Sequence, residues 1–243
     1  MSTAVTDGAR PQRAPASTSL VSTSAASVGS TSTGSTSTAA PKGRIRQANE
    51  ADILAAAEKV FARAGYAGAT MAEIAAQAGV PKSNLHYYFR TKQTIYHAVL
   101  TNILDLWLTQ TDCIEPEADP REALTHYIRA KMRLSAERPD ASRVFANELI
   151  HGAREIHGYL SQELRLLVDQ KAEVIAQWIA AGKMAPVDPR HLFFTLWAAT
   201  QTYADFDIQV CAVLGAEALT EAHMENATQH LLSLVLRGCG LQE

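Results

Sequence analysis

The chain has 243 residues, 47% of them hydrophobic and 19% charged, and its formal net charge is -3. These values are typical of a globular protein with one or two domains, and they exclude a fibrous or wholly disordered chain. No uninterrupted apolar run reaches the length of about 18 residues that a membrane-spanning helix needs. The three cysteines are far apart and lack metal-ligand spacing, which favours buried thiols in a reducing cytoplasm over redox or metal sites.

The first predicted element is a low-complexity tail over residues 1–41. Fifteen of the 22 residues from Ser17 to Thr38 are Ser or Thr. Such a segment buries too little apolar surface to offset its ordering entropy, so we expect it to be disordered. Between Gly8 and Asn49 every charged residue is basic. Although the whole protein is acidic, this basic N-terminal segment could bind the phosphates of a nucleic acid.

Helical patterns begin after Lys42. Apolar side chains recur at helical spacing through "ILAAAEKVF", and Gly65 is expected to end this first helix. Thr70, followed three residues later by Glu73, predicts a capping box at the start of "TMAEIAAQAG". A second short helix is predicted in "PKSNLHYYF", and a longer one begins after Thr91.

Two short helices joined at Gly79 are typical of a helix-turn-helix, in which the second helix enters the major groove of DNA. Polar and aromatic residues of this region fall where base edges and phosphates would lie. The candidate DNA-contacting residues are Arg44, Arg46, Thr70, Lys82, Ser83, Asn84, His86, Tyr87 and Lys92. The alternative is that this is an amphipathic helix pair with no role in DNA binding.

The segment "EPEADP" separates this region from a C-terminal part. That part is predicted to hold helices at 120–137, 140–153, 158–181, 188–213 and 220–237, and no alternating strand pattern occurs. The fold class is therefore all-α. The last two helices are expected to pair with those of a second copy, with an apolar strip of Leu231, Leu232 and Val235 at the interface.

The segment from Ile53 to Leu100, with its F-x-x-x-G-Y and I-A-x-x-A-G-V motifs, resembles the N-terminal domain of TetR-family transcriptional regulators. The pair His86-Tyr87 departs from the Leu-Tyr or Ile-Tyr of many members. The resemblance implies a TetR-like fold with a three-helix DNA-binding domain at 42–92 and a ligand-binding and dimerisation domain at 93–243. It also implies a cytoplasmic repressor that binds a near-palindromic operator as a homodimer and is not an enzyme.

Within the family, "ASRVFANEL" and "PVDPRHLFFTLWAATQTYADF" are similar to repressors of pyrimidine utilisation. This resemblance implies a uracil or thymine effector and control of genes for pyrimidine catabolism or nitrogen supply. No protein cofactor, metal site or membrane partner is expected.

The helix predicted from Asp188 carries Phe194, Trp197, Gln201, Ala204 and Ile208 on one face, which is apolar except for the glutamine. A buried amide needs partners for its donor and its acceptor, and the adjacent N–H and C=O of uracil match both. The candidate ligand-binding residues are Trp107, Arg143, Trp178, Trp197, Gln201, Tyr203 and Asp205. The simpler alternative is that this stripe is ordinary core.

Two other functions stay open at this point. One is a TetR-family repressor whose effector is another small planar or apolar molecule. The other is a helical ligand carrier or enzyme with a degenerate DNA-binding domain, although no catalytic or phosphate-binding motif occurs in the sequence.

Overall fold

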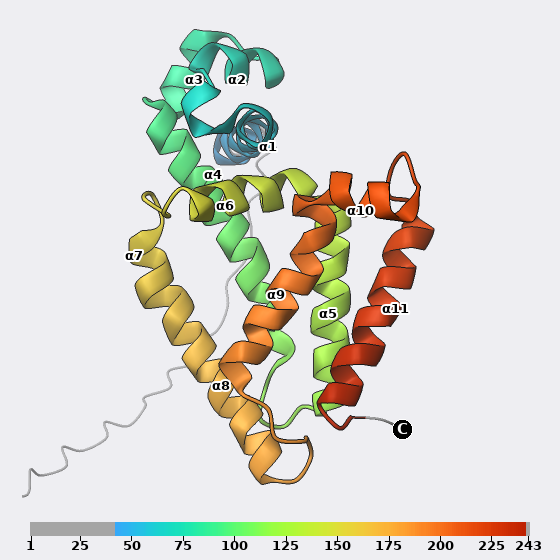
Figure 1. Cartoon of the computed structure of the whole chain (residues 1–243). Helices are drawn as coiled ribbons and strands as arrows, with labels where there is room; N and C mark the ends of the chain where they lie inside the picture. Colours follow the sequence, from blue (N-terminus) through green and yellow to red (C-terminus); the bar gives the residue numbers. More distant parts are fainter. Residues whose placement is uncertain (1–41, 242–243) are drawn as a thin grey trace, which may run out of the picture. The chain divides into compact units, whose positions relative to one another are not determined.

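The computed structural model describes residues 42–241, and within this range it is helical without a strand (Figure 1). The predicted all-α fold class is therefore confirmed. The predictions for the tail at 1–41 and for the side chains of Arg44 and Arg46 lie outside the described residues. None of the described helices combines the length and the apolar composition that crossing a bilayer requires.

The helices fall into an N-terminal group and a C-terminal group. The N-terminal group consists of α1 (Lys42–Gly68), α2 (Met71–Gln77), α3 (Lys82–Tyr88) and α4 (Lys92–Leu108). The C-terminal group consists of α5 (Pro120–Glu137), α6 (Pro139–Ile150), α7 (His157–Tyr159), α8 (Arg165–Ala180), α9 (Pro189–Asp205), α10 (Asp207–Leu214) and α11 (Glu221–Gly238). Short helical turns at Thr109–Cys113 (η1) and Leu160–Leu164 (η2) complete the fold.

One hydrophobic core joins α1 to α4 with α6. Ile53, Phe61, Ile74, Leu85 and Ile95 are buried in it, so each of the first four helices contributes an anchor. Because α4 and α6 also pack on each other, the N-terminal group rests directly on the C-terminal group.

A second core lies around α5, which packs against both α9 and α11 (Figure 1). The sequence assigned Leu231, Leu232 and Val235 to an exposed dimer strip, and this prediction is wrong. All three side chains are buried in the second core of their own chain. They are needed there because α11 has α5 as its main neighbour within the chain and must bury its apolar face against it.

The helix predicted at 188–213 is two helices, separated at Phe206. Arg143 explains the break. Its Nε donates to the carbonyl oxygen of Ala204 at 3.1 Å, an oxygen that in an unbroken helix would accept the N–H of Ile208. The chain is therefore diverted by a tertiary contact, without a proline or glycine at the break.

Candidate DNA-binding surface and ligand cavity

The turn between α2 and α3 is built by local hydrogen bonds. The Thr70 side chain accepts from the backbone N–H of Glu73, whose carboxylate accepts from the Thr70 N–H, so the predicted capping box is confirmed. Gly79 has a φ of 66°, in the left-handed region that favours glycine. Val80 N–H then donates to Ala75 O at 3.0 Å, which closes the turn and sets the angle of α3.

Helix α3 is held by its apolar side and presents a polar side to solvent. Leu85 and the adjoining Phe89 are buried in the first core. The exposed candidates for DNA contact on this helix are Lys82, Ser83, His86 and Tyr87, and Asn84 is half-buried. Tyr87 is the most prominent apolar group, with 69% of its surface exposed.

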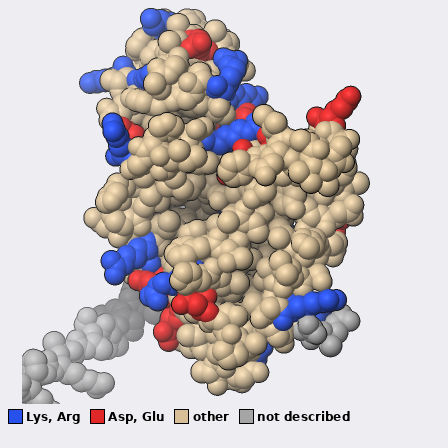
Figure 2. All heavy atoms as spheres, in the orientation of Figure 1, with Lys and Arg blue, Asp and Glu red and all other residues tan. Residues whose placement is uncertain are grey.

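The charge around this helix group also suits a polyanion. Figure 2 shows Lys and Arg side chains around the end of the molecule where α1 to α3 lie. Arg90, which follows Phe89 directly and is exposed, was not among the predicted contacts. Its place between α3 and α4 makes it a further candidate for a phosphate contact.

Lys92 does not have the environment that a phosphate contact requires. Its ammonium donates to the carbonyl oxygens of Tyr66 at 2.6 Å and Ala69 at 2.9 Å, with Ala67 at 3.4 Å, and lies over the Tyr66 ring. An ammonium has three N–H donors, and these acceptors occupy them. We therefore remove Lys92 from the candidate DNA contacts and assign it to capping the end of α1.

A cavity of about 230 Å³ lies between α4 and helices of the C-terminal group. Helices α4, α5, α6, α8 and α9 all contribute to its wall, together with both short helical turns. The aromatic and polar lining residues are Trp107, Thr111, Tyr127, Lys131, Phe145, Lys171, Phe193, Trp197 and Gln201. The remaining wall is mostly leucine, so the cavity is apolar with a few polar groups, as small-molecule sites usually are.

The aromatic wall is fixed by contacts among its own members. Trp107 packs edge-to-face on Phe145, with ring centroids 4.8 Å apart. Trp197 Nε1 donates to the Tyr127 hydroxyl at 2.8 Å. Trp107, Trp197 and Gln201, three of the predicted ligand contacts, therefore meet at one cavity, although Trp107 is far from the other two in sequence.

The other four predicted ligand contacts do not line this cavity. Trp178 is buried in the second core and donates to Pro116 O at 3.3 Å. Tyr203 and Arg143 face a different groove, between α5, α10 and α11. Asp205 is not in the wall; burial raises the pKa of its carboxyl, and the charges of Arg143 and Lys131 lower it in part. We withdraw these four assignments.

The predicted stripe on α9 is also corrected. Phe193 lines the cavity, whereas its neighbour Phe194 is half exposed. Ile208 lies beyond the break at Phe206 and is exposed, so it does not share a face with Gln201.

The sequence reasoning missed Lys131, a charged residue in the cavity wall. Only 3% of its surface is exposed, and its ammonium lies 4.2 Å from the centre of the Trp107 ring. Burial lowers the pKa of Lys131 to about 8, and the charge of Asp205 opposes this shift. Its spacing from Leu124 and Ile128, both buried on the same helix, was a signal that this lysine faces inward.

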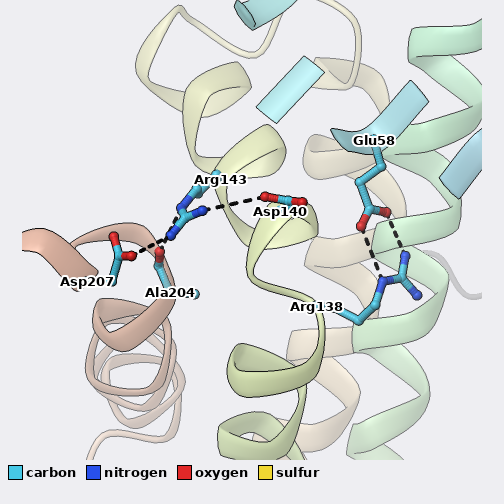
Figure 3. A network of polar contacts seen from close by, with 6 residues as sticks. All are labelled: Glu58, Arg138, Asp140, Arg143, Ala204 and Asp207. Carbon is cyan, nitrogen blue, oxygen red and sulfur yellow. Dashed lines mark hydrogen bonds and ion pairs between the residues drawn. The ribbon is translucent and has the colours of Figure 1, made fainter. Parts of the chain in front are cut away.

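Polar contacts connect the cavity helices to the N-terminal group through α6 (Figure 3). At the start of α6, Arg138 forms a two-point ion pair with Glu58 of α1. Further along, Arg143 binds Ala204 O at the end of α9 and the Asp207 carboxylate at 2.8 Å. Helix α6 therefore forms polar contacts both with α1 and with the C-terminal end of α9, the helix that carries Gln201.

Comparison with known proteins agrees with this arrangement. Residues 53–99 match the family of bacterial regulatory proteins called tetR, and residues 100–242 match the C-terminal region of YcdC-like proteins. The HTH-type transcriptional regulator RutR of Escherichia coli K12 is 40% identical over 197 residues, which cover 81% of this chain and 93% of that protein. The HTH-type transcriptional repressor NicS of Pseudomonas putida is 28% identical over 133 residues, covering 54% of this chain and 62% of that protein.

Among solved structures, AibR in complex with isovaleryl coenzyme A and operator DNA superposes with a TM-score of 0.62. It is 20% identical and covers 76% of this chain and 97% of that one, which supports the fold alone.

Proposed function

We propose that this chain, which belongs to the TetR family of bacterial transcriptional regulators, is a repressor released from its operator by uracil or thymine. The coarser part of this statement, a ligand-responsive transcriptional repressor that is not an enzyme, follows from its relatives. Its operator lies on bacterial DNA, so we assign the protein to the cytoplasm. The genes of pyrimidine catabolism or nitrogen supply are the proposed targets.

The observation that carries the pyrimidine proposal is Gln201 in the wall of an aromatic cavity of about 230 Å³. A void of about 150 Å³ lined by apolar side chains holds a benzene molecule, so this cavity suits a single ring with small substituents. Gln201 can pair with the adjacent N–H and C=O of a uracil ring, while Trp107 or Trp197 stacks on its face.

A purely apolar or acyl effector is the second candidate, because leucines form much of the wall. The isovaleryl coenzyme A in the AibR structure belongs to that protein, and a coenzyme A ester is far larger than this cavity. The polar groups Gln201, which is half-buried, and Lys131, which is buried, also argue for a polar ring, since an apolar ligand would cover both without giving either a partner.

For DNA binding, we propose that α3 enters the major groove with Lys82, Ser83, Asn84, His86 and Tyr87 toward the DNA. Thr70, at the start of α2, and Arg90 are proposed phosphate contacts, as are Arg44 and Arg46. Exposure of the four outward residues and the rigid turn at Gly79 support this orientation.

We propose a dimer that uses α10 together with the outer faces of α9 and α11. Ile208 and Val213 of α10 are 83% and 81% exposed, and several exposed apolar side chains on one helix favour a surface that a partner covers. Phe194 on α9 and Leu234 on α11 are exposed as well. Ile208→Glu combined with Val213→Glu should yield monomers in size-exclusion chromatography with light scattering; an unchanged dimer would refute this interface.

The test of the effector is calorimetric titration of the purified protein with uracil, thymine and cytosine. We expect saturable binding of uracil and thymine at one molecule per subunit, and rejection of cytosine. Absence of binding by uracil and thymine would refute the pyrimidine proposal and leave DNA binding to be tested separately.

A further inference from the structure

Lys131 has an unusual position for a lysine, because its charged end lies inside the protein at the cavity wall. Within residues 42–241 its ammonium forms no hydrogen bond or ion pair with another side chain or carbonyl; it lies 4.2 Å from the centre of the Trp107 ring, and the charge of Asp205 acts on it without a direct contact. A ring face stabilises a cation less than an oxygen acceptor does. A buried charge without a hydrogen-bonding partner is costly, so this group is poised for an acceptor from the cavity.

Three other polar groups of the cavity wall do not supply that acceptor. Lys171 donates to Ile114 O at 3.0 Å, and the Thr111 hydroxyl donates to Leu108 O at 2.7 Å. The Tyr127 hydroxyl already accepts from Trp197, which leaves its own proton to be donated. The cavity is therefore rich in donors, and a ligand that fits it must bring oxygen acceptors.

We propose that Lys131 is the specificity-determining residue of the cavity and that it selects ligands which place a carbonyl oxygen against its ammonium. This inference rests on the proposed function, since it concerns how the effector is recognised. Gln201 is on α9 and Lys131 is on α5, so the two side chains would form hydrogen bonds with different atoms of the ligand ring.

The selection follows from the donors and acceptors of the ligand. Uracil and thymine have two carbonyl oxygens, and the second stays available when Gln201 pairs with one edge. Cytosine carries an amino group in place of one carbonyl. An amino N–H that faces the ammonium cannot accept a hydrogen bond from it, and the two positively polarised groups repel each other. A hydrocarbon ring of the same size offers no acceptor and leaves the ammonium without a hydrogen bond.

The test compares the wild type with Lys131→Met, which keeps the length of the side chain and removes its charge. The matched control is Lys183→Met, because Lys183 is exposed on the turn after α8 and does not line the cavity. Calorimetry with uracil and cytosine gives both affinities, and thermal unfolding verifies folding. Lys131→Met also removes a charge that acts on Asp205, so the double variant Lys131→Met, Asp205→Asn is measured beside it and keeps the test valid if the single variant is unstable.

We expect Lys131→Met to weaken uracil binding by about 10- to 100-fold, the range for a hydrogen bond to a charged group, and to reduce the preference over cytosine. Lys183→Met should leave both values unchanged. Lys131→Met with wild-type uracil affinity and an unchanged preference would overturn the inference.

Failure of the proposed function has a separate signature, in which the wild type binds neither uracil nor thymine. In that case, thermal-shift measurements with succinimide, 2-pyridone and toluene would decide the role of Lys131. If succinimide and 2-pyridone stabilise the wild type but not Lys131→Met, the proposed role of Lys131 is supported. If toluene alone stabilises the wild type, the proposed role is overturned.

Discussion

Arg138 and Glu58 connect the proposed DNA-binding helices to the helix that borders the ligand cavity. Arg138 Nε and Nη2 lie 3.2 and 2.6 Å from the two carboxylate oxygens of Glu58, which is only 6% exposed (Figure 3). This geometry is the two-point pairing that favours arginine, and it raises the pKa of Arg138. Any movement of α6 on ligand binding must therefore carry α1 with it or break this pair.

Removing one partner of this pair should destabilise the protein. Arg138→Met leaves the Glu58 carboxylate buried without its partner, and we expect the free energy of unfolding to fall by about 2 kcal/mol. This value is below the roughly 3–5 kcal/mol typical of a fully buried pair, because 37% of the arginine side chain is exposed to solvent. Urea unfolding measures it. The double variant Glu58→Gln, Arg138→Met should regain part of the loss, and a purely additive result would mean that the two residues do not interact.

Lys92 should act on stability rather than directly on DNA. Lys92→Met removes the donor to the carbonyls at the end of α1, and we expect a loss of about 1 kcal/mol in unfolding free energy. The salt dependence of DNA affinity should keep its slope, because no phosphate contact is lost. A reduced slope without loss of stability would restore Lys92 to the DNA contacts.

Lys82 is the opposite case. Its side chain is exposed at the start of α3, and within residues 42–241 its ammonium has no hydrogen bond or ion pair. Lys82→Ala should weaken operator binding, lower the slope of log affinity against log salt by about one, and leave thermal unfolding unchanged. Fluorescence anisotropy over a series of salt concentrations measures the slope. An unaltered slope would exclude a phosphate contact by this residue.

Uracil affinity should depend on pH through Lys131. Burial lowers the pKa of Lys131 to about 8 in the free protein, and pairing with a carbonyl oxygen would raise it in the complex. The complex then holds the proton more tightly than the free protein does. The affinity for uracil is therefore highest below about pH 8 and falls as the pH rises above it. The other ionisable groups around this lysine are Tyr127, Lys171, Asp205 and, beyond Asp205, Arg143.

Calorimetry from pH 6 to 9 measures this dependence, and Lys131→Met provides the reference for titration of uracil itself and of the surrounding groups. The ratio of wild-type to variant affinity should fall above pH 8. A ratio that stays constant over this range would contradict pairing with the ammonium.

Local sequence signals correctly predicted the cap of α2 and the turn between α2 and α3. The cap at Thr70 and the turn at Gly79 depend on neighbouring residues, so they could be recognised from a few positions. The break at Phe206 could not, because Arg143, which holds Ala204 O there, is some sixty residues away in the sequence. Likewise, the burial of Leu231 was evident only once α5 was seen to cover α11.

The ligand cavity likewise combines features that neighbouring residues determine with features that depend on residues distant in the sequence. Periodicity predicted that Trp197 and Gln201 share a face of one helix, and they do line the cavity. It could not decide whether Trp178 or Trp107 completes the wall, since both lie at apolar positions of amphipathic helices. The packing of α8 turns Trp178 toward Pro116 instead. A lysine on the buried stripe of α5 was visible in the sequence, but its partner ring comes from α4.

Gln201→Leu separates ligand recognition from DNA binding. The change removes the amide that is proposed to pair with the ring edge and keeps the volume of the side chain nearly constant. We expect operator affinity without ligand to be that of the wild type, while uracil no longer releases the DNA. Release by uracil at wild-type concentrations would contradict the assignment of Gln201 to the effector.

The most direct test of a uracil-responsive repressor is release of bound DNA. A labelled duplex, selected by the protein from a random-sequence library, is followed by fluorescence anisotropy while uracil is added. We expect anisotropy to fall to that of free DNA with uracil and thymine, and to stay constant with cytosine. Persistence of the complex at uracil concentrations that saturate the protein by calorimetry would contradict the proposal that uracil is the releasing effector.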